Sequence, residues 1–330
     1  MHKAFNTPPK LHPRAHEPAG WDVAMFHRVP TRPIRYGHAP LPKGREAKAF
    51  VVPLQGLSEY MEKYFEVMHD LHDRDIEVWS LDWMGQGGSG RYLKNLDKRH
   101  AGRFQEDIDD LDYFMTNFVI PAAKGRPIIF LGHSMGAHLG LRYMAQHPDT
   151  VKCAGFTAPL TGVLAVKHLP LPVLYSMETF VSTFMAERYA TIQGDWNDHQ
   201  RPKPPLSIFS NDRKRNPVHA AWMEANPFLR IGGMTYKWVV EALGSCRSLR
   251  MEFSKIAAPC VVAIAAREMI VDNTSTRELV ESAPNMRLIE VPKSCHEILM
   301  EKDATRNKFL NEFFTLLDQN IQNKPDNTPG

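Results

Sequence analysis

The sequence predicts an α/β protein in which helices cover both faces of a mostly parallel sheet and a helical cap is inserted into the fold. Short apolar runs alternate with segments of helical spacing before residue 160 and again after residue 250, as is typical of parallel sheets. Residues 161–250 lack this alternation and hold many Met and aromatic residues around a Pro-rich, charged centre. We therefore predict a core of residues 1–160 and 251–330 and a mostly helical cap of residues 161–250.

The first part of the core is predicted from apolar runs of strand length. After a Pro-rich start of about 20 residues, which we expect to be flexible, the predicted strands are residues 34–39, 47–54, 76–83, 128–131 and 151–157. Aromatic and Met residues between Tyr60 and Leu71 recur at helical spacing behind Ser58, a residue type that often caps a helix. Two further helices are predicted at residues 108–118 and 135–145.

The last part of the core repeats strand, helix, strand and helix. The elements are predicted, in that order, at residues 260–266, 275–282, 286–291 and 307–321. Because the alternation is the same as in the first part, we expect these strands to extend the same sheet.

Composition and charge narrow the class of protein. The chain has 330 residues, of which 43% are hydrophobic and 23% charged, and its net charge of +3 is too small a basic excess to predict a nucleic-acid partner. No apolar run approaches the roughly 18 residues of a membrane span, and the start lacks the apolar core of a signal peptide. We expect a cytoplasmic protein, with peripheral contact at the inner membrane surface as the alternative.

The four cysteines do not form a recognisable framework. They show no CxxC spacing, so we expect reduced thiols and neither disulfides nor a metal site. These residues are Cys153, Cys246, Cys260 and Cys295.

A serine lies at the junction of a predicted buried strand and a predicted helix, in the motif "GHSMG". A turn tight enough to expose a nucleophile crowds its neighbours, so small residues are needed two positions before and after Ser134. Gly132 and Gly136 meet that requirement. The N-terminus of the following helix then directs its amides toward charge that develops on a substrate oxygen.

A serine nucleophile requires a histidine base and a carboxylate that orients the base. In proteins with this strand–serine–helix turn, the acid and then the histidine follow the serine in chain order, each on a loop after a later strand. The loop after residues 260–266 offers Glu268 and Asp272, and the loop after residues 286–291 offers His296. The order and the placement predict a catalytic triad, with the identity of the acid left open between these two residues.

The sequence resembles the α/β-hydrolase superfamily, and within it the bacterial lysophospholipases and monoacylglycerol lipases. The resemblance covers most of the chain and rests on "PLQGLSEYMEKY", "VWSLDWMGQGGSGR", "LGHSMGAH", "VDN" and "CHEILMEKDATR". The serine motif is shared across the superfamily. The motif "HEILMEKD" and the cap stretch "SNDRKRNPVHAAWMEANPFLRIGGMTYKWVVEAL" are narrower signals and favour lipid esters.

The resemblance implies a role for each matching residue. Ser134 is the nucleophile, His296 is the base, and the backbone amides of Leu57 and Met135 form the oxyanion hole. A Gln-Gly pair precedes Leu57 where relatives carry His-Gly, which keeps the amide but removes the histidine that would brace the loop.

The resemblance also bears on the acid. Relatives usually carry Asp at the position of Glu268 and a second acidic residue at the position of Asp272. Glu also serves in triads of this fold, and Asp272 lies where a cap for the next helix is expected. We therefore expect Glu268 to be the acid and keep Asp272 as the alternative.

Two other sequence features, a glycine run and a basic cluster, have simple structural interpretations. The run "GQGGSG" matches a dinucleotide motif, but no helical spacing follows it until about residue 104, so it is expected to be a turn beside the pocket. A basic cluster in the cap favours a solvated loop, with attraction to anionic lipid as the alternative. Its members are Arg201, Lys203, Arg213, Lys214 and Arg215.

These features together predict a serine hydrolase that cleaves carboxylic esters of fatty acids through an acyl-enzyme, without a metal or organic cofactor. Lysophospholipids or monoacylglycerols are the expected substrates. A short-chain carboxylesterase is the alternative within the same chemistry, and a non-catalytic ligand-binding protein is the alternative of another class.

Overall fold

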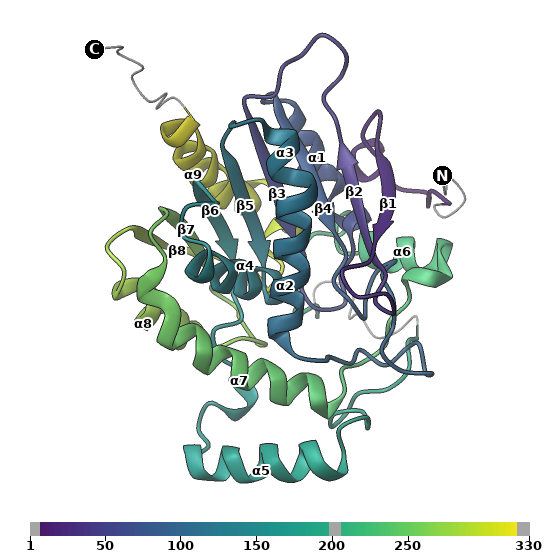
Figure 1. The fold of residues 1–330 in the computed structure, drawn as a ribbon, viewed down its shortest axis with the longest axis vertical. Helices are drawn as coiled ribbons and strands as arrows, with labels where there is room; N and C mark the ends of the chain where they lie inside the picture. Colours follow the sequence, from purple (N-terminus) through teal and green to yellow (C-terminus); the bar gives the residue numbers. More distant parts are fainter. Residues whose placement is uncertain (1–6, 198–205, 322–330) are drawn as a thin grey trace.

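The computed structural model describes residues 7–197 and 206–321, and within them eight strands form one sheet (Figure 1). The strand order is β1-β2-β4-β3-β5-β6-β7-β8; β1, β2 and β4 pair antiparallel, and all other neighbours pair parallel. The strands are β1 (Asp22–Phe26), β2 (Ile34–Ala39), β3 (Ala49–Leu54), β4 (Ile76–Leu81), β5 (Ile128–His133), β6 (Cys153–Thr157), β7 (Cys260–Ala265) and β8 (Met286–Val291). The predicted mostly parallel α/β sheet is confirmed.

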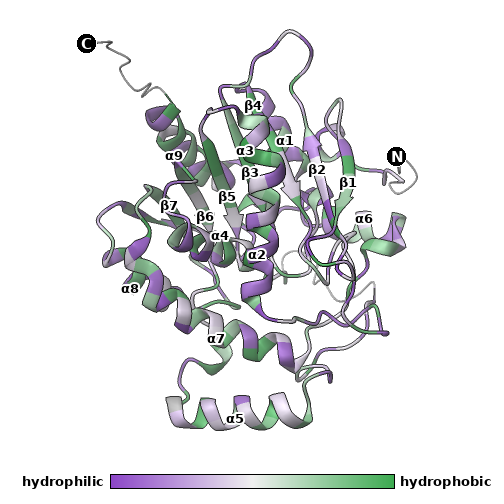
Figure 2. Ribbon diagram, in the orientation of Figure 1, coloured by the Kyte–Doolittle hydropathy of each residue, from purple (hydrophilic) through white to green (hydrophobic). Residues whose placement is uncertain are grey.

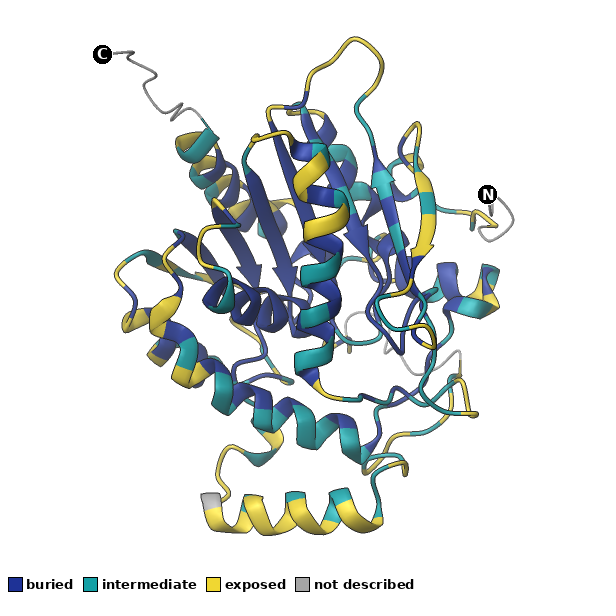
Figure 3. Cartoon of the chain, viewed as in Figure 1, coloured by how far each residue is buried: buried dark blue, intermediate teal, exposed yellow. Residues whose placement is uncertain are grey.

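Helices cover both faces of this sheet. The described α-helices are α1 (Phe65–His72), α2 (Phe104–Phe114), α3 (Ile120–Ala123), α4 (Met135–Gln146), α5 (Leu171–Phe184), α6 (Val218–Ala225), α7 (Tyr236–Glu252), α8 (Asn273–Glu281) and α9 (Asp303–Ile321). One apolar cluster joins α1 and α9 to one face, and a second joins α2, α4 and α8 to the other. The four central strands β3, β5, β6 and β7 are buried along their whole length (Figure 3). Figure 2 shows many hydrophobic residues along these strands.

Three elements differ from the prediction. Ser58 does not cap a helix, because its φ of 60° lies in the left-handed region and the chain enters α1 through a 3-10 turn, Met61–Tyr64. The helix predicted from residue 108 begins at Phe104 and widens into a π-helical turn after α2. Strand β1 was not predicted, because its edge position leaves most of its residues exposed and gives no clean alternation.

The segment between β6 and β7 divides into parts with different surroundings. Helix α7 lies beyond the carboxyl ends of the central strands, and α5 lies outside α7 (Figure 1). Figure 3 shows α5 as mostly exposed. Helix α6 instead packs beside α1, where Trp222 meets Phe65 edge to face at 5.6 Å between ring centroids. Part of the segment predicted as a cap, residues 161–250, thus packs with the apolar residues of the core.

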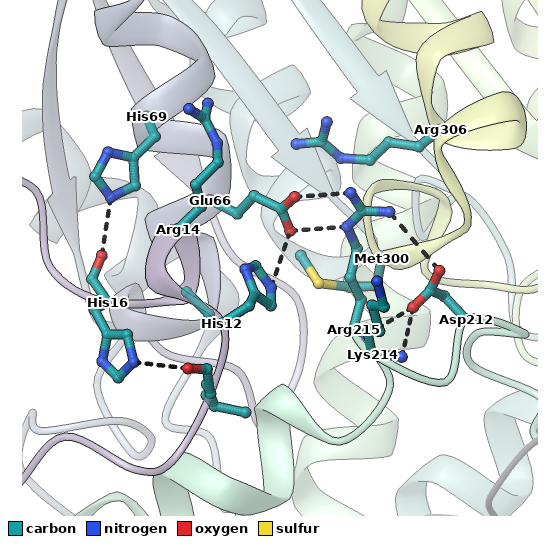
Figure 4. Close-up of polar contacts among 12 residues, drawn as sticks. His12, Arg14, His16, Glu66, His69, Asp212, Lys214, Arg215, Met300 and Arg306 are labelled. Atoms are coloured by element: carbon teal, nitrogen blue, oxygen red, sulfur yellow. Dashed lines mark hydrogen bonds and ion pairs between the residues drawn. The ribbon is translucent and has the colours of Figure 1, made fainter.

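Arg215 ties the segment before α6 to the core (Figure 4). Its guanidinium donates to both carboxylate oxygens of Glu66 on α1, at 2.7 and 2.8 Å, and also to Asp303. A side chain held in this way and only 12% exposed is a structural cation. Arg215 therefore fits neither the expected solvated loop nor the alternative of attraction to anionic lipid. Arg201 and Lys203 lie outside the described residues.

The start of the chain also packs on the core. Residues 1–6 lie outside the described residues, but Arg14 donates to Asp70 at 2.7 Å and Ala15 is buried. The carbonyl of Ala15 accepts a hydrogen bond from the indole of Trp222. Figure 4 shows His12 beside Glu66, with 3.7 Å between Nε2 and Oε2. These contacts restrain residues 12–15, within the stretch that the Pro-rich sequence predicts to be flexible.

Within residues 7–197 and 206–321, no helix is both long enough and apolar enough to cross a membrane. All four cysteines are buried free thiols.

Candidate active site

The serine lies in the sharp turn between β5 and α4. Ser134 has φ 51° and ψ −117°, a conformation that costs a non-glycine residue energy and persists only where the surroundings fix it. Its N–H donates to the carbonyl of Thr157 at 3.0 Å, and its own carbonyl accepts from His138 at 3.0 Å and from Leu160 at 3.1 Å. The strained serine is therefore held by backbone bonds from both sides.

The two flanking glycines are required by space. A Cβ on Gly136 would lie 2.2 Å from the carbonyl oxygen of Leu54, and a Cβ on Gly132 would lie 2.7 Å from Cα of Ala137. Real Cβ atoms do not approach backbone this closely, so any side chain here would push α4 away from the sheet. The tight turn that the "GHSMG" motif predicts is present.

Three side chains from three loops form a continuous chain of hydrogen bonds. His296 follows β8, and its Nε2 lies 3.0 Å from Oγ of Ser134. Its Nδ1 lies 2.9 Å from Oε2 and 3.0 Å from Oε1 of Glu268, which follows β7. Ser134 is 7% exposed and His296 4%, so the chain lies in a largely water-free environment.

Backbone N–H groups hold Glu268 in its charged form. Its Oε1 accepts hydrogen bonds from the amides of Met269, Ile270 and Val271, at 3.0, 2.8 and 3.3 Å. Burial by itself raises the pKa of this carboxyl, but His296 and the backbone N–H groups outweigh burial, so the pKa lies below its ordinary value. A carboxylate that stays charged orients the imidazole with Nδ1–H toward it.

The alternative acid, Asp272, has a different position. Its side chain accepts a hydrogen bond from the amide of Thr274 at 3.0 Å and is the N-cap of α8. The structure therefore brings Glu268 to His296 and leaves Asp272 at the helix end.

Two backbone amides are the candidates for the oxyanion hole. Met135 is the first residue of α4, next to the serine, and Leu57 follows the Gln-Gly pair after β3. Among residues 7–197 and 206–321, neither of these two N–H groups has a hydrogen-bond acceptor. Unpaired backbone amides, one of them at the start of a helix, are suited to an oxygen that acquires negative charge.

Side chains clamp the loop that carries Leu57. Gln86 donates to the carbonyl of Gly56 at 2.8 Å and accepts from the amide of Ser58 at 3.0 Å, so it holds the backbone on both sides of Leu57. Gln55, at the position where the resemblance implies a histidine, donates to the hydroxyl of Ser80 at 2.6 Å. The loop is thus braced without that histidine.

Gln86 belongs to the glycine run that the sequence analysis assigned to a turn beside the pocket. The signal for its role was a polar residue in the loop that follows β4, at the carboxyl edge of the sheet. Arg99 was also missed. It is fully buried, donates from Nε to Gln86 at 2.9 Å, and has Nη2 3.7 Å from the sulfur of Met135.

A second histidine lies against the site. The rings of His133 and His296 meet edge to face, with centroids 4.8 Å apart. Burial lowers the pKa of His133 to about 4, so this ring is neutral near pH 7. His133 therefore packs beside the base without adding a positive charge to it.

Comparisons with known proteins identify chains that resemble this one. The family model Hydrolase_4, described as serine aminopeptidase, S33, matches residues 45–303. Lysophospholipase L2 of Escherichia coli is 28% identical over 299 residues, which cover 87% of this chain and 84% of that protein. Monoglyceride lipase of Saccharomyces cerevisiae is 22% identical over 284 residues, with coverage of 83% and 86%. The crystal structure of a soluble variant of that yeast lipase, bound to a substrate analogue, aligns with a TM-score of 0.72 at 18% identity and covers 95% of this chain and 99% of that one.

Proposed function

This chain belongs to the Hydrolase_4 family, serine aminopeptidase S33. We propose that it hydrolyses carboxylic esters of fatty acids through an acyl-enzyme, as its lysophospholipase and monoglyceride lipase relatives support. Its substrates are lysophospholipids or monoacylglycerols, because the relatives that it matches over more than four fifths of their length are named lysophospholipase and monoglyceride lipase.

The observation that carries the proposal is the hydrogen-bond chain from Ser134 through His296 to Glu268, next to the free amides of Leu57 and Met135. A serine 3.0 Å from its base, with that base 2.9 Å from an orienting acid, forms the arrangement that activates a hydroxyl for acyl transfer.

The reaction follows from the positions of these atoms. Oγ of Ser134 attacks the ester carbonyl carbon while Nε2 of His296 takes the hydroxyl proton, and Glu268 stabilises the imidazolium that forms. The Leu57 and Met135 amides donate to the carbonyl oxygen as it becomes negative. His296 then protonates the leaving alcohol, and a water molecule, deprotonated by the same ring, releases the fatty acid.

We further propose that α5 contacts the lipid surface that supplies the substrate. Five of its apolar or aromatic side chains are 44–68% exposed: Val173, Tyr175, Met177, Phe180 and Phe184. Its one charged residue, Glu178, is paired with Arg247 on α7 at 2.7 Å. The other exposed residues of α5 include Ser176, Thr179 and Thr183, so its exposed surface is uncharged and largely apolar or aromatic. Such a helix fits a lipid–water interface better than bulk water.

Vesicle binding tests this contact. The double variant Val173→Ser with Phe180→Ser should reduce binding to zwitterionic vesicles at least tenfold, and salt should have little effect because the contact is apolar. Ile120→Ser, which alters an exposed apolar residue on α3, is the matched control and should bind as the native protein does. Native binding by the double variant, or binding that disappears with salt, contradicts the proposal.

Fatty-acid release from lysophosphatidylcholine and from a monoacylglycerol of the same chain length tests the function. We expect turnover of at least one lipid and no turnover by Ser134→Ala. Cleavage of a short-chain aryl ester alone would reduce the proposal to a general carboxylesterase, and undiminished lipid turnover by Ser134→Ala would refute it.

A further inference from the structure

A buried lysine lies between two buried carboxylates, one of which belongs to the residue directly after His296. The side chain of Lys63 is 1% exposed, and its ammonium group contacts Oε1 of Glu59 and lies 2.7 Å from Oε1 of Glu297. Both carboxylates are themselves buried, with side chains 3% and 5% exposed. We call these three residues the Lys63 bridge.

One end of the Lys63 bridge holds the oxyanion loop. Oε2 of Glu59 accepts the N–H of Gly56 at 2.6 Å and the hydroxyl of Tyr64 at 2.7 Å. Gly56 directly precedes Leu57, so Glu59 fixes the peptide before the amide that we assign to the oxyanion hole. A Cβ on Gly56 would lie 3.0 Å from Oε2 of Glu59, which shows how closely carboxylate and backbone approach.

The other end holds the histidine loop. Glu297 is the residue directly after His296, and the backbone amides of His296 and Glu297 donate to the carbonyls of Ile208 and Phe209 at 3.2 and 2.8 Å. The loop is thus anchored through its backbone on one side and through the Glu297 carboxylate on the other. The Lys63 bridge is the charged connection between the two loops.

Stability alone does not account for such a bridge. Removing three charges from water is costly, and a well-packed apolar cluster of the same volume is often as stable or more so. What buried, charge-assisted hydrogen bonds provide is directional geometry, because each carboxylate and ammonium tolerates only a narrow range of partner positions. Here they fix the distance between an amide and an imidazole that must act on the same substrate carbonyl.

We propose that Lys63 is a positioning residue for catalysis, which sets the oxyanion amide of Leu57 and the base His296 at the spacing that the reaction needs. The inference rests on the proposed function. Acyl transfer is sensitive to shifts of less than 1 Å in such groups, so loosening the connection lowers turnover without removing a group that touches the substrate.

The first experiment compares Lys63→Met with Lys63→Arg, using Lys48→Met as the control. Lys48 is an exposed lysine paired with Asp75 at 2.9 Å, far from the site. Active sites are titrated to completion with a fluorophosphonate, and kcat is expressed per titrated site. We expect Lys63→Met to lower kcat by 10- to 100-fold with KM changed less than threefold, Lys63→Arg to recover most of the loss, and Lys48→Met to behave as the native protein.

A purely structural lysine gives a different result. Lys63→Met would then titrate to fewer active sites and unfold more easily, but each titrated site would keep the native kcat, which overturns the inference. Failure of Lys63→Arg to recover any activity also overturns it, because Arg can donate to both carboxylates.

A double-mutant cycle covers the case in which Lys63→Met does not fold. Glu59→Gln and Glu297→Gln each break one end of the same connection, so the double variant should lose no more kcat than the worse single variant. Multiplied losses would mean that the two carboxylates act separately, and the inference would be wrong. Ser134→Ala separates the two proposals: if it abolishes lipid turnover while Lys63→Met has native kcat, only the bridge fails, whereas turnover by Ser134→Ala refutes the proposed function itself.

Discussion

Replacing Glu268 by Gln should nearly abolish turnover, and the reason lies in the hydrogen bonds that the carboxylate makes. Three backbone N–H groups converge on Oε1, so the amide oxygen of Gln takes that position. The NH₂ group then takes the place of Oε2, 2.9 Å from Nδ1 of His296, where it can only donate. The imidazole must switch to the tautomer with its proton on Nε2, and that proton faces Ser134.

The magnitude follows from this loss of the base. A ring that carries its proton on Nε2 cannot accept one from Ser134, and the corresponding change in a serine protease triad costs about 10⁴ in kcat, or about 5 kcal/mol. We expect a loss of 10³- to 10⁴-fold in fatty-acid release, with thermal unfolding shifted by only a few degrees.

Asp272 provides the matched control. Asn is as good an N-cap as Asp, so Asp272→Asn should keep native kcat and stability. Asp272→Ala should lose about 1 kcal/mol of unfolding free energy and keep kcat. If Asp272→Asn loses orders of magnitude in turnover while Glu268→Gln remains active, the assignment of the acid is wrong.

Three further predictions concern the elbow, the oxyanion loop and pH. Gly136→Ala should leave no active protein, because its Cβ would lie 2.2 Å from the carbonyl of Leu54; active-site titration of a folded, native-like variant would contradict this. Gln86→Leu releases the clamp on the oxyanion loop and should lower kcat about tenfold with little change in KM; a native kcat argues against the clamp. Burial lowers the pKa of His133 to about 4 and that of His138 to about 3, so the unfolded chain binds their protons first as pH falls below about 6.5. The unfolding free energy should then fall by up to about 1.4 kcal/mol per pH unit for each ring. Urea unfolding at pH 6.5 and at pH 5 should show a smaller drop in this free energy for His138→Gln than for the native protein. An equal drop in both proteins would contradict the prediction.

Much of the fold was predictable because its central strands are buried on both faces. The central strands are continuous apolar runs, which the sequence displays directly, and the glycine pair around Ser134 reports a steric requirement of the turn. The chain order of serine, acid and histidine then indicated which later loops to examine. The choice between Glu268 and Asp272 rested on the resemblance and on the helix cap, since both lie in the same loop.

The positions missed by sequence depend on distant partners. In the sequence, Lys63 is a polar residue in an apolar stretch with nothing to indicate a special role. Only the fold places the carboxylate of Glu297 against its ammonium group. Serine is a residue type that often caps a helix, but the loop that presents Leu57 holds Ser58 at positive φ. Arg215 was grouped with neighbouring basic residues because sequence does not show that Glu66 lies opposite it.

The central claim is that Ser134 becomes acylated through His296. Reaction with a fluorophosphonate, followed by mass analysis of the intact protein and its peptides, tests it directly. We predict one equivalent of label on the peptide that contains Ser134, no label in Ser134→Ala, and labelling slowed at least 100-fold in His296→Ala and in Glu268→Gln. Label on another residue, or none on a folded native chain, would contradict the account.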